Sequence, residues 1–235
     1  MTGPSRDDVV RPGSVPASRR PTVTTTTTLD QGPVSPASAP GTRRQSTRGR
    51  ARTVVVAGTA GGVGTTTVTA LVWDAVVRRG GTPSASDHTE GALAARLPVD
   101  AWGAPTRDAV VTLHDLGAHA TGPGDVFKVP ENSAVLVTPA SPAGLEAIRR
   151  ALRRITAHGE GEGPAATVVV VTEPFGRPRA DEVVRAVTGE HPRVSVVRLP
   201  ADPALAGSGA LRPARLLPTT LRAAEAVVDR LGLGL

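Results

Sequence analysis

The sequence contains no cysteine and no tyrosine, and its 235 residues include only two phenylalanines and two tryptophans. The absence of cysteine excludes disulfides and cysteine-ligated metal sites. Aromatic residues make up 2% of the chain, so a hydrophobic core has to be built from valine, leucine, alanine and isoleucine. So few aromatic side chains also cannot form the stacking platform on which single-stranded nucleic acid is usually bound.

Lysine is almost absent as well. Lys128 is the one lysine among 27 basic residues, a bias that points to GC-rich coding before it points to a nucleic-acid surface. The net charge of +6 lies entirely in residues 1–52, which hold nine arginines and three acids. The remaining chain has 18 basic and 18 acidic residues, so the globular part is formally neutral. Charge location therefore gives no support to a DNA-binding globular domain.

Long apolar runs are also missing. No stretch approaches the roughly 18 consecutive apolar residues of a membrane-spanning helix. The N-terminus lacks the apolar h-region of a secretory signal. These features lead us to expect a cytoplasmic protein.

Residues 1–51 are predicted to be a disordered tail. They are rich in proline, serine, threonine and arginine, and Thr24–Thr28 is a homopolymer. Such a segment cannot bury enough apolar surface to offset its ordering entropy. Three roles stay open: a solvated tether, a segment that binds DNA or an anionic membrane through residues 43–52, and a kinase substrate at Ser46, which follows Arg43 and Arg44.

From residue 52 onward, apolar runs alternate with amphipathic stretches. The strand-like runs are Thr53–Ala57, 82–86, Asp108–Leu113, Ala134–Thr138, Thr167–Thr172 and Val194–Leu199. Helical periodicity follows at 68–79, from Pro142 to Ile155 after an N-cap at Ser141, at Asp181–Thr188, and from Thr219 to Leu231. Strands alternating with helices predict a mostly parallel, doubly wound α/β sheet with helices on both faces.

A glycine-rich loop joins the first predicted strand to the first predicted helix. It contains Gly61, Gly62 and Gly64, which let the chain curl closely around a ligand. A strand–loop–helix turn of this kind points backbone N–H groups and a helix N-terminus at one place, which suits phosphate. The alternative is a strand–helix turn without a ligand.

This loop resembles the deviant Walker A motif of the MinD/ParA family of P-loop ATPases, Lys-Gly-Gly-x-Gly-Lys-Thr-Thr. Residues 60–67 read Ala-Gly-Gly-Val-Gly-Thr-Thr-Thr, so six of the eight positions fit. The two that differ are the two lysines, replaced by Ala60 and Thr65. In the family the first lysine reaches across a dimer and the second contacts the β and γ phosphates.

The resemblance continues to the end of the chain and covers residues 52–235. The segment from Ser86 to Leu97 resembles the family's stretch after strand two, although Ala85 stands in place of one acid. Asp115 resembles the acid that ends the Walker B strand, and the segment from Leu199 to Leu205 resembles the family's proline-aspartate loop beside the adenine. Thr172 stands where the family often has asparagine.

The resemblance implies a P-loop NTPase fold, with ATP or ADP and Mg²⁺ as ligands. Thr66 and Asp115 would hold the Mg²⁺, although Asp115 could instead cap a strand end. Asp87 would be a remnant of the catalytic acids, or else a solvated loop acid. The implied nucleotide-binding residues are Gly61, Gly62, Val63, Gly64, Thr65, Thr66, Thr67, Pro200 and Asp202.

Loss of both lysines predicts little or no ATP hydrolysis. Phosphoryl transfer requires positive charge around the γ-phosphate. In other enzymes, removing one charge-stabilising group from the active site lowers the rate by a factor on the order of 10²–10⁵. We therefore expect a catalytically impaired positioning or scaffold subunit that works through a protein partner. One alternative is an active ATPase that takes a cation from a partner or a second subunit. Another is a DNA- or membrane-associated factor that works through its tail.

Two further expectations concern assembly and the C-terminus. With Ala60 in place of the signature lysine, a nucleotide-dependent homodimer is not expected, while a constitutive homodimer stays open. Residues 231–235 are interrupted by glycine and have no flanking lysines, so we expect the last helix to pack on the sheet rather than on a membrane.

Overall fold

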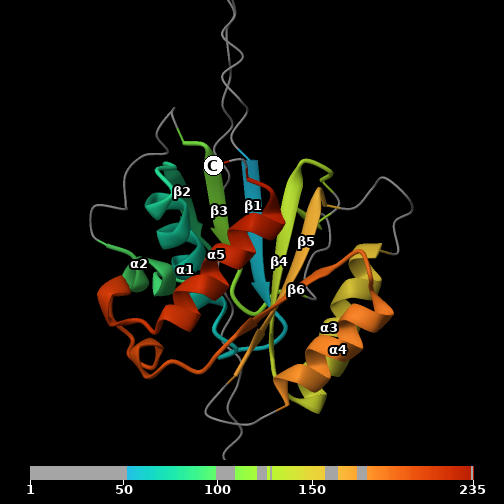
Figure 1. Ribbon diagram of the computed structural model, residues 1–235. Helices are drawn as coiled ribbons and strands as arrows, with labels where there is room; N and C mark the ends of the chain where they lie inside the picture. The colour runs from blue at the N-terminus through green and yellow to red at the C-terminus, as the bar shows by residue number, and fades with distance from the viewer. Residues whose placement is uncertain are drawn as a thin grey trace, which may run out of the picture. The chain divides into compact units, whose positions relative to one another are not determined.

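Short valine-rich segments form a six-stranded sheet in which every neighbouring pair is parallel (Figure 1). Its order is β2-β3-β1-β4-β5-β6, so the first strand of the domain lies in the interior of the sheet. The strands are β1 (Arg52–Gly58), β2 (Pro83–Asp87), β3 (Val111–Asp115), β4 (Asn132–Pro139), β5 (Ala166–Thr172) and β6 (Ser195–Leu199). Because the strands are parallel, their carboxyl ends meet at one edge of the sheet, where α/β proteins bind ligands.

The computed structural model describes residues 52–98, 109–120, 126–127, 129–156, 164–173, 179–233 and 235. The predicted tail, residues 1–51, lies outside this part of the chain, together with Ser46 and all of the candidate DNA- or membrane-binding segment except Arg52. Disorder, phosphorylation and surface binding by the tail therefore stay predictions.

Helices cover both faces of the sheet (Figure 1). The helices are α1 (Thr65–Arg78), α2 (Ala92–Arg96), α3 (Pro142–Thr156), α4 (Ala180–Glu190) and α5 (Pro218–Leu231), with 3₁₀ turns η3 (Pro203–Leu205) and η4 (Pro213–Arg215). Side chains of α1 and α5 pack on one face, and those of α3 and α4 pack on the other. The predicted doubly wound α/β fold is confirmed, and the last helix packs on the sheet as expected.

The core consists mainly of two layers of mostly aliphatic side chains, one on each side of the sheet. Alternate residues of β1 supply both layers: Val54 and Val56 face α1 and α5, whereas Val55 and Ala57 face α3. All four are fully buried. Burying one valine contributes roughly 1.5–3 kcal/mol, so continuous valine runs stabilise a central strand without any aromatic residue.

Two details differ from the sequence-based expectation. The third strand runs from Val111 to Asp115, not from Asp108 to Leu113, because pairing with β1 extends to the register partners Val56 and Asp115. The polar residues at the end of this strand resemble a loop in sequence, but their pairing with β1 keeps them in the strand. The short helix α2 was not predicted, since five residues are too few to show a helical period.

Helix ends follow the expected capping chemistry. The backbone N–H of Gly144 donates to Oγ of Ser141 at 3.0 Å, which confirms Ser141 as the N-cap of α3. Gly80 has a φ of 79° directly after α1, a conformation that favours glycine. Gly81 then donates its N–H to the carbonyl of Val76 at 3.0 Å, which satisfies one of the free carbonyls at the helix end.

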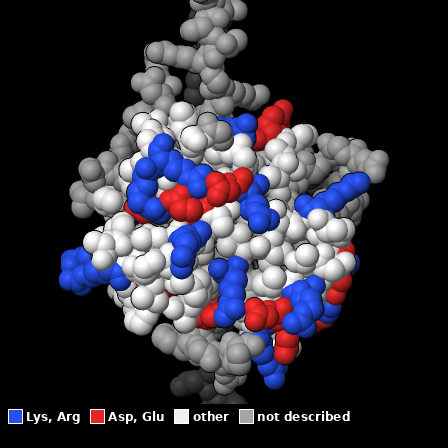
Figure 2. Space-filling model, in the orientation of Figure 1, with Lys and Arg blue, Asp and Glu red and all other residues white. Residues whose placement is uncertain are grey.

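The charged surface is mixed in sign. On the face covered by α1 and α5, basic and acidic side chains lie among uncharged residues (Figure 2). This agrees with the formal neutrality of the chain beyond residue 52. In the described part of the chain, no helix has the length and apolar character needed to cross a bilayer.

Candidate functional site

The loop between β1 and α1 lies at the carboxyl edge of the sheet. Gly62 and Gly64 have φ angles of 72° and 93°, in the left-handed region that favours glycine. A Cβ added to Gly61 or Gly62 would meet no atom within 4 Å. The concave side of the loop is therefore open, and the backbone there is accessible to a ligand.

The loop presents a row of unpaired hydrogen-bond donors. Within the described residues, no acceptor pairs with the backbone N–H groups of residues 60–67. The first bond of α1 runs from Val68 N–H to the carbonyl of Gly64 at 2.9 Å. A helix N-terminus carries a partial positive charge of roughly half an elementary charge, so these donors favour an anion.

Neighbouring strands hold the loop in place. The hydroxyl of Thr172, at the end of β5, donates to the carbonyl of Val63 at 3.0 Å, with the carbonyl of Thr138 at 3.3 Å. Thr59 donates its N–H to the carbonyl of Val137 in β4 at 2.9 Å. Thr172 stands where the resemblance places asparagine, and here its hydroxyl fixes the loop backbone.

A pocket of about 560 Å³ extends from this loop along the carboxyl ends of β4, β5 and β6. Of the predicted nucleotide-binding residues, it is lined by Gly61, Gly62, Val63, Gly64, Thr67, Pro200 and Asp202. The other lining residues were not assigned as binding residues from the sequence, although Ala60, Thr172 and the segment Leu199–Leu205 belong to the family-like stretches; they are Ala60, Pro139, Thr172, Glu173, Leu199, Ala201, Pro203, Leu205 and Ala206. The carboxyl ends of the predicted strands could have indicated several of them.

No side-chain cation lines the pocket. Among its described lining residues, none is lysine, arginine or histidine. Glu173 lines the pocket, but its carboxylate already forms an ion pair with Arg198. Arg198 in turn forms a second ion pair with Asp181 at 3.0 Å. Among the described residues that line the pocket, attraction for an anion therefore comes from the backbone.

Thr65, which replaces the loop lysine, faces away from the pocket. It is 6% exposed and does not belong to the pocket lining. A Cβ added to Gly58 would lie 2.1 Å from Oγ1 of Thr65. The threonine side chain thus occupies the space beneath the loop, against the end of β1.

Asp115 and Thr66 come together beside the loop, as the sequence predicted. Asp115 is fully buried, and its Oδ1 accepts the N–H of Gly117 at 3.0 Å. Its Oδ2 is buried and accepts no hydrogen bond from any residue the structure describes. Burial raises the pKa of Asp115, and the Gly117 N–H and the nearby Thr66 hydroxyl offset this only in part. A buried carboxylate oxygen without a partner is the kind of group that a cation satisfies.

Asp87 lies next to Asp115 in the sheet, and the two are register partners of β2 and β3. Both oxygens of Asp87 are already engaged. Oδ1 accepts the N–H and hydroxyl of Thr89 at 2.7 and 2.5 Å, and Oδ2 accepts the N–H groups of Leu93 and Ala94 at 3.0 and 3.1 Å. Burial raises the pKa of Asp87, but these four hydrogen bonds together lower it by more, so the net pKa shift is downward. These contacts give Asp87 a capping role at α2.

Asp202 lines the pocket, but its carboxylate points into the protein. Oδ1 accepts the N–H of Ala204 at 2.9 Å, and Oδ2 accepts the N–H of Leu217 at 2.8 Å and the hydroxyl of Thr220 at 2.7 Å. One carboxylate thus ties both ends of the segment 203–217. Pro200 and Asp202 shape the pocket wall, while the Asp202 oxygens are unavailable to a ligand.

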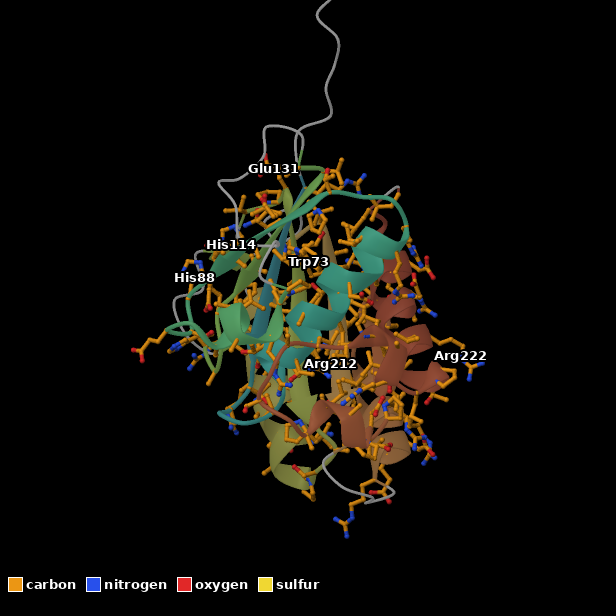
Figure 3. The ribbon with its side chains drawn as sticks, turned by 90° about the vertical axis from the view of Figure 1, so that its left-hand side faces the viewer. Trp73, His88, His114, Glu131, Arg212 and Arg222 are labelled. Atoms are coloured by element: carbon orange, nitrogen blue, oxygen red, sulfur yellow. The ribbon has the colours of Figure 1, made fainter. Side chains whose placement is uncertain are left out.

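A pair of histidines lies on the β2 side of the sheet (Figure 3). The rings of His88 and His114 stack with centroids 5.5 Å apart, and Nε2 of His88 lies 3.2 Å from Nδ1 of His114. Burial lowers the pKa of His114, and so does the neighbouring His88. No group of three or more potential metal ligands occurs among the described residues. The pair does not line the pocket.

The residues present fit a nucleoside phosphate and one Mg²⁺ ion. The unpaired N–H row and the open loop suit phosphate, and the free Oδ2 of Asp115 beside Thr66 suits Mg²⁺. The apolar wall from Leu199 to Leu205 has room for a base.

Comparisons with solved structures agree with this arrangement. The MinD cell division protein of Aquifex aeolicus is similar over 76% of this chain and 97% of its own, with 14% identity and a TM-score of 0.55. Apo McdA from Cyanthece is similar over 78% of this chain and 100% of its own, with 14% identity and a TM-score of 0.52. An ATP complex of a McdA variant from Cyanothece covers 77% and 96%, with 13% identity and a TM-score of 0.52. No family model and no curated protein matches the sequence.

The strand order and the glycine loop between β1 and α1 define a protein of the P-loop NTPase fold. Within that class, its fold is that of the MinD/ParA-like ATPases. At 14% identity the similarity establishes the fold, and the chemistry has to be argued from the residues of this chain.

Proposed function

We propose that this protein binds a nucleoside phosphate without hydrolysing it and acts as a positioning or scaffold subunit through protein partners. The observation that carries the proposal is the composition of the pocket. Eight consecutive backbone N–H groups, those of residues 60–67, have no acceptor in the described chain, yet none of the described residues that line the same pocket carries a cationic side chain. Phosphate binding requires free backbone N–H groups, whereas hydrolysis requires side-chain cations.

Each part of the site has an expected role. The loop from Gly61 to Thr67 would hold the phosphates through backbone N–H groups, as backbone donors do at other helix N-termini. Thr66 and Asp115 would hold Mg²⁺, which supplies positive charge when bound. Pro200 and its neighbours would contact the base. A solved structure of the fold neighbour McdA, in a variant form, is an ATP complex, which supports ATP or ADP as the ligand class.

Calorimetric titration tests binding. We expect ATP and ADP to bind in the presence of Mg²⁺, and to bind more weakly when Asp115→Asn removes the metal-binding carboxylate. A matched control is Asp181→Asn, which removes an exposed carboxylate of α4 that does not line the pocket. Absence of heat with both nucleotides, with the protein shown to be folded, would exclude a nucleotide-binding role.

Phosphate release tests hydrolysis. We expect the protein to release phosphate from ATP no faster than its Asp115→Ala variant. Turnover above that control would support the alternative of an active ATPase. If turnover appears only with a second protein present, a partner supplies the missing cation.

Oligomeric state tests the scaffold role. We propose a cytoplasmic protein whose assembly does not depend on nucleotide, because Ala60 cannot reach a phosphate on a second subunit. Light scattering after size exclusion should give one mass with and without ATP and Mg²⁺. A shift to twice that mass on adding ATP would contradict the proposal.

A further inference from the structure

The segment between Asp202 and Glu225 carries charge of one sign. Residues 203–224 include three arginines, Arg212, Arg215 and Arg222, and no acidic residue. All three side chains are exposed. Figure 3 shows Arg212 on the side of the molecule where Trp73 of α1 lies, with Arg222 at the margin of the same view. We name these three residues, together with Leu217, the arginine surface.

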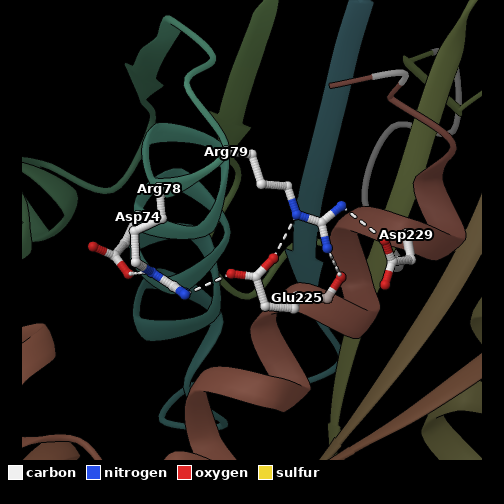
Figure 4. A network of polar contacts seen from close by, with 5 residues as sticks. All are labelled: Asp74, Arg78, Arg79, Glu225 and Asp229. Carbon is white, nitrogen blue, oxygen red and sulfur yellow. Dashed lines mark hydrogen bonds and ion pairs between the residues drawn. The ribbon is translucent and has the colours of Figure 1, made fainter.

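Acids near this surface are already engaged. Glu225 forms ion pairs with Arg78 and Arg79, each at 2.5 Å, and Asp229 pairs with Arg79 at 2.7 Å (Figure 4). Asp202 is buried and directed inward. In the part of the chain that the structure describes, no acidic side chain pairs with Arg212, Arg215 or Arg222. Their charge is therefore directed to solvent or to another molecule.

The backbone that carries the arginines is held in place. The Arg96 side chain of α2 donates to the carbonyl of Leu205 at 3.3 Å, and Leu211 donates its N–H to the carbonyl of Arg96 at 2.8 Å. Leu205 and Leu211 pack against the core layer of α1 and α5. A surface fixed in this way loses little conformational entropy when a partner binds.

Leu217 adds an apolar contact to the same surface. It lies between η4 and α5 and is 43% exposed, the largest exposed fraction among the large hydrophobic residues. Arginine is enriched at protein interfaces and pairs with carboxylates through two parallel hydrogen bonds. Three exposed arginines and an exposed leucine within residues 212–222 thus match a partner that carries both acidic and apolar side chains.

We propose that the arginine surface docks an acidic, partly apolar segment of a partner protein. A nucleic acid fits less well, because the chain beyond residue 52 is formally neutral and the next turns of α5 carry Glu225 and Asp229. The tail of this chain, or of a second copy, is excluded by its own positive charge, since residues 1–51 hold eight arginines and three acids. The surface therefore selects a protein of opposite charge.

Docking is linked to the pocket through the segment 203–217. Pro203, Leu205 and Ala206 line the pocket, and Asp202 hydrogen-bonds both ends of the segment. A partner on the arginine surface and a ligand in the pocket therefore contact opposite parts of one fixed segment. This link, unlike the docking itself, rests on the proposed nucleotide binding, and it would be reciprocal.

Hydrogen exchange of the full-length protein tests the proposal. The probe is a short peptide of alternating glutamate and leucine, and the readout is amide exchange in residues 203–222. We expect slower exchange there with peptide present. Because the readout is local, binding of the same peptide to the basic tail does not interfere with it.

Two triple variants make the comparison specific. R212Q/R215Q/R222Q should weaken the peptide-induced protection of this segment about fivefold or more. Each exposed ion pair with the peptide contributes only a small binding free energy, but the variant removes three of them. R150Q/R185Q/R193Q removes the same charge from exposed arginines of α3, α4 and the following loop, and should leave the protection unchanged.

The outcomes separate cleanly. Equal loss in both variants, or no protection of residues 203–222 in the parent protein, would overturn the docking surface. Stronger protection by a short DNA duplex than by the peptide would assign the surface to nucleic acid and overturn it too. If nucleotide fails to bind while the peptide still protects, the proposed function fails and the docking surface stands.

Discussion

The hydroxyl of Thr65 lies 2.1 Å from the position that a Cβ on Gly58 would occupy. The last residue of β1 and the first residue of α1 are thus packed so closely that one side chain excludes the other. The threonine that replaces the loop lysine is consequently part of the packing beneath the phosphate-binding loop.

Gly58→Ala should destabilise the protein by about 1–3 kcal/mol, the usual cost of overpacking a closed site. The added methyl would overlap Thr65 Oγ1 and would lie 2.9 Å from Cγ2 of Val63, so the loop has to move. Denaturant unfolding of Gly58→Ala, Thr65→Ala and the double variant measures the coupling. Removing the hydroxyl should restore part of the loss, and strictly additive effects would contradict this packing.

Thr65→Lys should raise the affinity for ATP about tenfold. The long lysine stem can leave the buried position and bring its ammonium group to the phosphates. Thr65→Gln is the control, because it has comparable reach without charge. Calorimetry with ATP and Mg²⁺ compares the two variants. If both bind alike, charge at this position does not limit binding.

Asp115→Asn should stabilise the ligand-free protein at neutral pH. Because burial raises the pKa of Asp115, the folded state disfavours its charged form, and stability falls as pH rises from the unfolded-state pKa through the folded-state pKa. The variant should therefore melt above the parent at pH 7, by roughly 2–4 °C for each kcal/mol gained. The difference should shrink below about pH 4. A variant that melts lower at pH 7 would show that the carboxylate is satisfied in the folded protein.

Asp202→Ala should be strongly destabilising, by about 2–4 kcal/mol, because three hydrogen-bond donors lose their acceptor, among them the buried Thr220 hydroxyl. Although burial raises the pKa of Asp202, its hydrogen bonds lower it on balance. Its contribution is therefore present above the unfolded-state pKa and is lost as pH falls through the lower folded-state value. Thr220→Val removes one of the three bonds and should cost about 1 kcal/mol. Urea unfolding at pH 7 and pH 3 would show both effects.

Much of the fold follows from local sequence patterns. Valine runs such as Thr167–Thr172 have the length and composition of buried parallel strands, and the Ser141 cap and Gly80 mark helix ends through local chemistry. The glycine loop is equally local, since its conformation and its N–H groups depend on consecutive residues. These features were predicted because neighbouring residues determine them.

Long-range contacts determine the features of the site that local sequence patterns do not predict. No pattern in the sequence reveals that Asp202 hydrogen-bonds Leu217 and Thr220, so a residue expected to face nucleotide instead holds a loop. Likewise, the engagement of Asp87 by α2 requires a helix too short to show a period. The direction of the Thr65 side chain depends on its packing against β1. The sequence motifs indicated residues that lie around the loop, whereas the direction of their polar atoms required the three-dimensional structure.

The eight amide groups of the loop have a practical consequence for handling the protein. Sulfate or phosphate in a storage buffer would fill the same place as a nucleotide phosphate and would raise the melting temperature by mass action. An inorganic anion at ten times its own Kd would weaken the apparent nucleotide affinity roughly tenfold. A protein purified in phosphate could then look inert in a nucleotide assay while its loop is intact, so chloride-based buffers without polyvalent anions are the appropriate medium.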